Sequence, residues 1–312
     1  MCGIAGFVND MPIDVKCPVL QRMTDMIAHR GPDSEGHYID EHAALGHRRL
    51  SIIDLGGGQQ PIYNEDGSKV ITFNGEIYNY QTLREELIAA GHTFTTKSDT
   101  EVLLHGYEQW GVDLLQRVRG MFTFVIWDKN KQELFGARDH FGIKPFYYAK
   151  MNGTFMYASE IKSLLRHPDF VKELNAEALK PYMTFQYPAI GETFFKGVYK
   201  LPEGHYFTYR DGKMDIHRYY DEDFREGKQK LGELVNSIDQ TVCDSVKAHQ
   251  IADVEVGSFL SSGVDSSYVA AVARPQHTYS IGFGKGTYNE SQQAGELAEL
   301  LKLNNTAESL TD

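Results

Sequence analysis

The sequence predicts a two-domain protein, in which an α+β domain of mixed sheets covered by helices (residues 1–220) precedes a parallel α/β domain (residues 231–312). The first two-thirds of the chain are rich in aromatic residues and short β-prone runs but contain few helical patterns. After Tyr220 strands, loops and helices alternate, which is typical of a parallel sheet. The stretch 221–230 (DEDFREGKQK) is charged and weakly apolar, and we interpret it as a linker.

The strands of the first domain are predicted from short runs of β-branched and aromatic residues. Six such runs cover residues 3–8, 69–73, 121–127, 133–137, 146–149 and 154–158. Two further runs lie at residues 205–209 and 213–217. The Asp211-Gly212 pair between them favours a tight turn, so these two runs are expected to form a hairpin.

Two helices are predicted in the first domain, at residues 82–90 and 99–110. A glycine follows each stretch directly, and glycine is common just past the C-terminus of a helix. The second stretch has Ser98 or Asp99 as its N-cap, since either side chain can accept a hydrogen bond from the first turn.

The second domain is predicted to begin with a helix at residues 231–249, where apolar residues recur at helical spacing. The next elements alternate between strand and helix and cover residues 254–260, 267–273, 278–283 and 290–301. Two parallel strands with their helices are too few to bury both faces of a sheet. We therefore expect this domain to be truncated, with its remainder beyond Asp312.

Composition and charge exclude some classes of function for this protein. The 312 residues include 41% hydrophobic and 24% charged residues, as in ordinary soluble globular proteins. The formal net charge of -12 argues against general binding to nucleic acid or an anionic membrane, and no apolar run is long enough to span a bilayer. The three scattered cysteines fit a reducing compartment. We expect a cytoplasmic protein without nucleic-acid or membrane partners.

Cys2 is the first candidate catalytic residue. Taken alone, a cysteine directly after the initiator methionine is most often an ordinary small residue. If Met1 is removed, however, a free α-amine lies on the same residue as the thiol. Such an amine has a pKa of about 7.7–8 and can take the thiol proton, so one residue supplies both nucleophile and base.

Seven short motifs, taken in order along the chain, carry a family resemblance. They are MCGIAG (residues 1–6), HRGPD (29–33), GHRRLSIID (46–54), FNGEIY (73–78), SDTE (98–101), RDHFGIKP (138–145) and ASEIK (158–162). The set resembles the class II glutamine amidotransferases and, over essentially the whole chain, the glutamine-hydrolysing asparagine synthetases of the asparagine synthetase B family. The resemblance implies an N-terminal-nucleophile glutaminase fold, with stacked β-sheets between helical layers.

The resemblance also implies residues that bind glutamine. Arg49 would hold the α-carboxylate through a planar, bidentate guanidinium, although an arginine beside Arg48 can also be a solvated ion-pairing residue. Asp99 would bind the α-ammonium group, and a purely structural N-cap is the alternative; both roles can hold together.

An oxyanion hole is implied at Asn74 and Gly75, with the Asn74 side-chain amide and the Gly75 N–H directed at the tetrahedral intermediate. In isolation Asn-Gly is also typical of a simple hairpin turn. In the family, the backbone around Ile52, Ile53 and Glu76 lines the same pocket, although the two isoleucines are equally consistent with plain core positions.

A second candidate site lies at residues 256–267 (VGSFLSSGVDSS), where an apolar strand runs through a serine-rich loop into a helix. Backbone N–H groups at a helix N-terminus can cradle phosphate, and the loop resembles the S-G-G-x-D-S pyrophosphate loop of the ATP pyrophosphatases. The Walker A pattern and its lysine are absent from it. An ordinary serine-rich turn is the alternative.

The residues implied to bind ATP are Leu260, Ser261, Ser262, Gly263, Asp265, Ser266 and Ile281. Asp265 is also expected to help hold Mg²⁺ together with the pyrophosphate. Ser262 departs from the motif, because it stands where the first glycine is usual. If that position requires a positive φ, serine is penalised there.

The resulting hypothesis is a glutamine-hydrolysing asparagine synthetase. Ammonia released at Cys2 would amidate aspartate through a β-aspartyl-AMP intermediate, with glutamine, aspartate and ATP as substrates. ATP and Mg²⁺ would serve the synthetase half, and the glutaminase half would need no cofactor. A homodimer is implied by the family. This chain is expected to retain only glutaminase activity, because the family's second phosphate-binding segment and its aspartate-recognition residues are expected beyond Asp312.

Three alternatives remain. A related amidotransferase acting on another carboxylate would share both modules, although a β-lactam-forming relative is not expected to keep Cys2. A stand-alone glutaminase or glutamine-binding module is the second alternative. A phosphosugar or purine-pathway amidotransferase would share only the first domain, and the loop at residues 261–266 argues against it.

Overall fold

The computed structural model describes residues 1–187, 190–283 and 290–310. The chain divides into two compact units, Met1–Asp223 and Phe224–Asp312, which are described in turn. No helix in the described part is long and apolar enough to cross a membrane.

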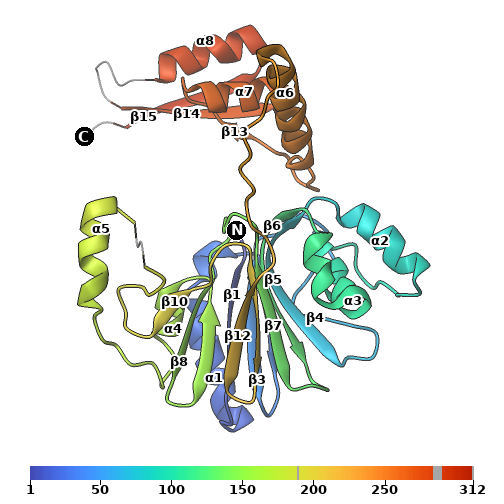
Figure 1. The fold of residues 1–312 in the computed structure, drawn as a ribbon, viewed down its shortest axis with the longest axis vertical. Helices are drawn as coiled ribbons and strands as arrows, with labels where there is room; N and C mark the ends of the chain where they lie inside the picture. The colour runs from blue at the N-terminus through green and yellow to red at the C-terminus, as the bar shows by residue number, and fades with distance from the viewer. Residues whose placement is uncertain (188–189, 284–289, 311–312) are drawn as a thin grey trace. The chain divides into compact units, whose positions relative to one another are not determined.

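The first unit contains two six-stranded sheets in which all neighbouring strands pair antiparallel (Figure 1). In spatial order, the first sheet consists of β10 (Val198–Lys200), β8 (Tyr147–Met151), β9 (Thr154–Ala158), β1 (Gly3–Val8), β3 (Ala43–Arg49) and β2 (Ser34–Ile39). The second sheet consists of β12 (Lys213–Arg218), β11 (His205–Arg210), β7 (Glu133–Arg138), β6 (Gly120–Asp128), β5 (Lys69–Ile77) and β4 (Ile62–Tyr63).

The two sheets are stacked face to face on an aromatic core. Ile4 of β1 and Phe155 of β9 share one buried cluster with Val125 and Trp127 of β6 and Phe207 of β11. Because adjacent residues of a strand point to opposite faces, Ala5 and Phe7 of β1 lie in a second cluster on the outer side of the first sheet. β1 is therefore buried on both faces, which gives the residue directly before it a rigid support.

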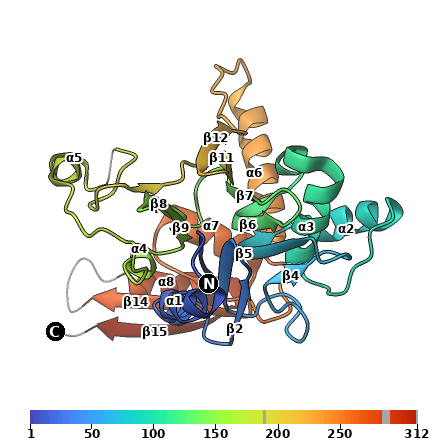
Figure 2. The same cartoon turned by 90° about the horizontal axis from the view of Figure 1, so that it is seen from below.

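Helices cover the outer faces of the two sheets. α1 (Ile13–Asp25) and α4 (Ile161–Leu164) lie on the first sheet, and α3 (Asp99–Trp110) lies on the second with α2 (Tyr80–Ala89) packed beside it. α5 (Leu179–Phe185) buries none of its residues and packs on a 3₁₀ turn, η3 (Ala176–Ala178); two further 3₁₀ turns are η1 (Ala28–Arg30) and η2 (Gly111–Gln116). α1 packs Leu20 and Met23 against the first sheet. α3 covers the second, where the Tyr107 ring stacks on Phe135 of β7, and it lies beside α2 in both views (Figures 1 and 2). The arrangement is helices, sheet, sheet, helices.

Most predicted elements of the first unit are confirmed. β1, β9 and α3 have the expected bounds, and Ser98 rather than Asp99 is the N-cap of α3. In the β11–β12 hairpin, Asp211 and Gly212 both have positive φ, as a tight primed turn requires. The hairpin-turn alternative for Asn74-Gly75 is wrong, because β5 continues through both residues to Ile77.

The second unit contains a three-stranded parallel sheet of β13 (Ser258–Phe259), β14 (His277–Phe283) and β15 (Asn304–Leu310). Its helices are α6 (Leu231–Ala248), α7 (Val264–Ala273) and α8 (Ser291–Leu301). The prediction of two strands was wrong, because β15 is a third strand. It was missed because its sequence (NNTAESL) is polar and lacks an apolar pattern. The strand predicted at residues 254–260 is shorter, and α7 begins three residues earlier than residue 267.

The core of the second unit is small. Its buried cluster consists of Leu260 and three alanines of α7 and α8. On β14 the residues alternate strictly, so that Thr278 and Ser280 are buried whereas Tyr279 and Ile281 are about half exposed. One face of this sheet is therefore covered by helices, and apolar side chains are exposed on the other face.

Candidate active site

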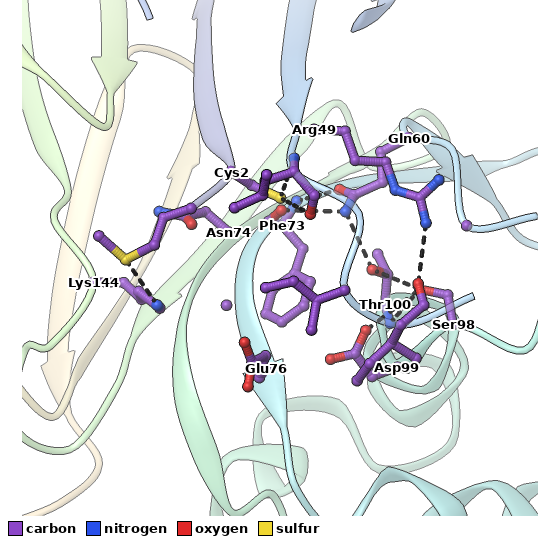
Figure 3. A pocket seen from close by; sticks show the side chains of 16 residues that line it. Cys2, Arg49, Gln60, Phe73, Asn74, Glu76, Ser98, Asp99, Thr100 and Lys144 are labelled. Atoms are coloured by element: carbon purple, nitrogen blue, oxygen red, sulfur yellow. Dashed lines mark hydrogen bonds between the residues drawn. The ribbon is translucent and has the colours of Figure 1, made fainter. Parts of the chain in front are cut away.

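A pocket in the first unit collects every residue that the sequence implicated in glutamine chemistry (Figure 3). These are Cys2, Arg49, Ile52, Ile53, Asn74, Gly75, Glu76 and Asp99. They come from the start of β1, the end of β3 and the loop after it, the second half of β5, and the first turn of α3. In the view of Figure 3, Cys2 and Asn74 lie on one side of the pocket and Ser98 and Asp99 on the other.

Cys2 is held at the end of a buried strand, with its sulfur facing the pocket. The Leu50 N–H donates to Sγ at 3.4 Å, and the Leu50 carbonyl lies 3.5 Å from the same sulfur. Burial raises the pKa of the Cys2 thiol above its usual range. At neutral pH the thiol therefore keeps its proton, and it needs a base before it can attack a carbonyl carbon.

Two of the family motifs meet behind Cys2. Arg30, from HRGPD, donates from Nε to the Cys2 carbonyl oxygen at 2.9 Å and from Nη1 to Glu160 at 3.2 Å. Glu160, from ASEIK, also accepts from Lys162 at 2.9 Å. The neighbouring Ser159 hydroxyl accepts from the Ile4 N–H at 3.0 Å. These contacts fix the main chain from the Cys2 carbonyl to the Ile4 N–H, directly after the nucleophile.

Arg49 is buried, which contradicts the alternative of a solvated surface arginine; only 5% of its surface is exposed. Its Nη2 donates to the carbonyl oxygens of Ile53 at 3.0 Å and Asp54 at 2.7 Å. The loop after β3 thus orients the guanidinium by its backbone carbonyls. Because neither acceptor is a carboxylate, the charge of Arg49 stays available to an anionic ligand in the pocket.

Asp99 opens α3 and is also buried. Its Oδ2 accepts from the Ile77 N–H at 2.9 Å, which links the helix to the end of β5. Burial raises the pKa of Asp99 to about 7, and the negative charge of Glu76 adds to the rise. A cationic ligand group would stabilise its ionised form.

Asn74 presents a buried amide without a partner. Neither its Nδ2 nor its Oδ1 forms a hydrogen bond within residues 1–187, 190–283 and 290–310, and the residue is 1% exposed. A buried polar group left unsatisfied costs about 1–3 kcal/mol. Such a cost is expected where a ligand supplies the missing partner.

Gly75 is required by close packing of β5 on β6. A Cβ at this position would overlap the Met121 carbonyl oxygen and lie 2.7 Å from Phe122 Cα, both of which are backbone atoms. We predict that Gly75→Ala lowers the free energy of unfolding by about 1–3 kcal/mol and impairs catalysis. Denaturant titration measures the change. Gly232→Ala is the control, because nothing lies within 4 Å of that Cβ, and it should be neutral or stabilising. Equal stability of Gly75→Ala and the parent would contradict the packing argument.

Seven further residues line the pocket that the sequence analysis did not name as site residues. They are Leu50, Gly58, Gln60, Phe73, Ser98, Thr100 and Lys144. Gln60 pairs with the backbone of Phe73, accepting from its N–H at 2.6 Å and donating to its carbonyl at 3.2 Å, and so braces β5 just before Asn74. No local sequence signal marks Gln60.

Lys144 belongs to the RDHFGIKP motif, so the sequence did contain a signal that could have identified it as a site residue. Asp139 accepts from the N–H groups of Phe141, Ile143 and Lys144 and so shapes the loop that carries the lysine to the pocket. Burial lowers the pKa of Lys144. Its Nζ contacts the sulfur of Met1 at 3.1 Å.

The serine-rich loop of the second unit connects β13 to α7. The Ser261 and Ser266 hydroxyls are 2.8 Å apart, and the Gly263 N–H donates to the Ser261 hydroxyl at 3.2 Å. Asp265 is exposed in the first turn of α7. A helix N-terminus with hydroxyl groups and one carboxylate fits a phosphate group with Mg²⁺, since Mg²⁺ commonly takes one or two carboxylates together with phosphate oxygens.

Two features of this loop refine the sequence expectations. Ser262 does not have a positive φ, so its replacement of a glycine carries no backbone strain. Leu260 lies beside β14, since its N–H donates to the Tyr279 carbonyl at 2.8 Å, but its side chain and that of Ile281 differ in burial. Leu260 is buried among α7 and α8, whereas Ile281 is half exposed on β14.

Two family models match successive parts of the chain. The glutamine amidotransferase domain matches residues 1–220, and asparagine synthase matches residues 237–312. The chain therefore belongs to the glutamine amidotransferase family. Its fold is similar to that of glutamine phosphoribosylpyrophosphate amidotransferase from B. subtilis, with a TM-score of 0.54 at 16% identity over 98% of this chain and 65% of that chain. The predicted fold class is confirmed.

The similarity to curated proteins is more specific. The chain is 44% identical to asparagine synthetase (glutamine-hydrolyzing) 1 from Bacillus subtilis (strain 168), over 98% of this chain and 49% of the relative. It is 36% identical to asparagine synthetase (glutamine-hydrolyzing) 3 from the same organism, over 91% of this chain and 48% of the relative. The chain spans about half the length of these relatives. The resemblance predicted from the motifs is confirmed.

Proposed function

We propose that the first domain (residues 1–220) hydrolyses glutamine at Cys2, after removal of Met1. The observation that carries the proposal is the unpaired amide of Asn74 in the same pocket as Cys2, Arg49 and Asp99. Release of ammonia and glutamate from glutamine by the purified chain is the direct test.

Glutamine recognition is assigned to the buried charges. Arg49 binds the α-carboxylate, and Asp99 binds the α-ammonium group. Ile52, Ile53 and Glu76 line the pocket around them. Holding both α-substituents orients the side-chain amide toward Cys2, and positioning of this kind lowers the entropic cost of the reaction.

The chemistry begins with a proton transfer. The α-amine of Cys2 takes the thiol proton, and the thiolate attacks the glutamine side-chain carbonyl carbon. The Asn74 Nδ2 and the Gly75 N–H donate to the resulting oxyanion. The intermediate then collapses: the C–N bond breaks, and the ammonium returns its proton to the leaving ammonia. Water hydrolyses the thioester to glutamate and regenerates the thiol.

The raised pKa of Asp99 predicts a pH dependence. Only ionised Asp99 binds an ammonium group, so kcat/KM for glutamine should rise as pH increases through about 7, and one pH unit below that value the ionisation of Asp99 alone should reduce it about tenfold, in addition to the loss of the neutral Cys2 α-amine. Asp99→Asn should raise KM by about 10²-fold and remove this ionisation from the profile. Steady-state kinetics between pH 5.5 and 8.5 measure both effects, and an unchanged KM in Asp99→Asn would contradict the assignment.

The same variant tests the electrostatic argument on stability. The folded-state pKa of Asp99, about 7, lies above its ordinary value of 3.8, so the native state binds more protons across that window. The unfavourable contribution of Asp99 to stability therefore grows as pH rises from about 4 to 7. Asp99→Asn should be more stable than the parent at pH 8, and this advantage should shrink toward pH 4. Thermal unfolding at the two pH values measures it.

For the intact enzyme we propose an ATP-dependent synthetase that uses this ammonia. ATP would adenylylate the β-carboxylate of aspartate and release pyrophosphate, and ammonia would displace AMP to give asparagine. The loop from Ser261 to Ser266 would hold the phosphates, and Asp265 would help to hold Mg²⁺. The asparagine synthase match over residues 237–312 and the relatives named above support this proposal. Calorimetric titration with Mg-ATP tests the loop, and Asp265→Asn should weaken binding.

The remaining expectations stand as parts of the proposal. The glutaminase domain would need no cofactor, and the enzyme would act in the cytoplasm as a homodimer. An amidotransferase that uses another carboxylate is the alternative, and asparagine formation in place of an amidated analogue distinguishes the two.

A further inference from the structure

A group of histidine and glutamate side chains outside the glutamine pocket comes from three separate segments. Glu65 lies in the turn between β4 and β5, His92 follows α2, and His105 and Glu108 lie one turn apart on α3. One ligand-type atom of each of the four residues lies within 4.8 Å of the others. α3 and β4, which bring the segments together, lie side by side in Figure 1.

Three contacts within the cluster have the length expected between neighbouring ligand atoms of a tetrahedral ion. An ion at about 2.0–2.1 Å from each of four ligands separates neighbouring ligand atoms by about 3.3–3.4 Å. Glu65 turns one oxygen to each imidazole, at 3.3 Å from His92 Nδ1 and 3.4 Å from His105 Nδ1. Glu108 Oε2 lies 3.2 Å from His105 Nδ1.

Both histidines direct Nδ1 to the centre of the cluster. His92 Nε2 lies 3.2 Å from the amide oxygen of Gln109, whereas His105 Nε2 lies 3.5 Å from Glu101 Oε1 and forms no hydrogen bond within the described residues. Metal-bound histidines in proteins usually donate their second N–H to such an oxygen, which fixes the tautomer. Glu101 is itself held by four hydrogen bonds from the N–H and hydroxyl groups of Thr95 and Thr96.

The two carboxylates are oriented in the same way. The Thr93 N–H donates to Glu65 Oε1 at 3.0 Å, and the Asn64 side-chain amide donates to Glu108 Oε1 at 2.7 Å. His105 is fully buried, whereas the Glu65 side chain is 37% exposed. The cluster is therefore fixed on its inner side and open to solvent at Glu65, which gives an ion a path of entry.

We propose that Glu65, His92, His105 and Glu108 form a tetrahedral site for a divalent transition-metal ion of the zinc type. Two imidazoles and two carboxylates suit Zn²⁺ better than Ca²⁺ or Mg²⁺, which prefer all-oxygen sites. Four protein ligands leave no open position, so the ion has a structural role. It joins the β4–β5 turn and the loop after α2 to α3, the helix whose first turn carries Asp99.

Titration of the metal-free chain with Zn²⁺ and Co²⁺ tests the site. One Zn²⁺ per chain should bind and raise the melting temperature by several degrees. Co²⁺ should give the intense visible absorption of tetrahedral coordination, and Zn²⁺ should displace it. His92→Ala should weaken Zn²⁺ binding by at least about 100-fold, and Gln109→Ala, which removes only an outer acceptor, by about 10-fold.

The test changes His92 and leaves His105 in place, because a change at the buried His105 could unfold the domain. Two control variants then show whether Zn²⁺ binds at this cluster. His217→Gln removes an exposed imidazole on β12, outside the cluster, and should leave Zn²⁺ affinity unchanged. Cys2→Ala should also bind Zn²⁺ like the parent, which separates this site from the pocket thiol. The proposal is overturned if no stoichiometric ion binds, if His92→Ala binds Zn²⁺ as tightly as the parent, or if binding is lost in Cys2→Ala; in each of these cases the cluster is held by ion pairs alone.

Discussion

The Cys2→Ala variant is expected to lose glutamine hydrolysis by at least about 10³-fold while keeping the fold of the parent. In our proposal Asn74 and Gly75 stabilise an oxyanion only once a nucleophile has formed it, so we expect that the remaining pocket cannot replace the thiol. The fold should survive, because the hydrogen-bonding contacts of Sγ are those with the Leu50 backbone at 3.4 and 3.5 Å. Glutamate release and thermal unfolding are the two measurements.

Matched cysteine variants show whether the loss is specific. Cys17 is exposed on α1 and Cys243 lies on α6 of the second unit, and neither lines the pocket. Cys17→Ala and Cys243→Ala should therefore hydrolyse glutamine at the parental rate. Undiminished hydrolysis by Cys2→Ala would contradict the assignment of Cys2 as the nucleophile. A loss of hydrolysis in all three variants would indicate that the substitutions disturb the fold instead.

The elements predicted correctly are those with a local cause. Ser98 caps the N-terminus of α3, and Gly111 ends the helix with a positive φ. Residues next to the helix therefore determine both of its ends. The β11–β12 hairpin has the same property, because its turn needs positive φ at Asp211 and Gly212. Local backbone preferences favour such elements independently of distant partners.

The missed strands depend on partners far away in the sequence. β3 (AALGHRR) contains no β-branched residue, yet it pairs with β1 on one side and β2 on the other. Its β-propensity is poor, and the sheet selects its conformation by burial between neighbours. β15 of the second unit also has a sequence with little β-propensity. This polar segment is a strand because it pairs with β14.

The site residues also divide into those with a local sequence signal and those whose role depends on the folded structure. Cys2, Arg49, Asn74 and Asp99 were predicted because each stands in a motif, but neither the burial of Arg49 nor the raised pKa of Asp99 has a local signal. Gln60 acts through the backbone of Phe73, which only the folded sheet brings to it. Of the proposed metal ligands, only the spacing of His105 and Glu108 on one helix was visible in the sequence.

A chain whose N-terminus is blocked should be as inactive as Cys2→Ala, although its thiol is intact. Burial raises the pKa of the Cys2 thiol, so a base is needed, and the pocket residues offer no neutral imidazole for that purpose. Lys144 is the other amine that lines the pocket, and Asp99 is committed to the ammonium group of the substrate in our proposal. While a residue precedes Cys2, its nitrogen is an amide, which cannot accept the thiol proton.

A cleavable N-terminal extension turns this argument into one experiment on one preparation. With the extension in place, hydrolysis should be reduced by at least about 10³-fold, and cleavage directly before Cys2 should restore it. Cleavage that leaves one extra residue is the matched control, since it frees an amine at the wrong position and should restore nothing. Full activity with that extra residue would show that the α-amine of Cys2 is not the base. The free Lys144 amine would then be the remaining candidate, because burial lowers its pKa toward the range in which a lysine can accept a proton.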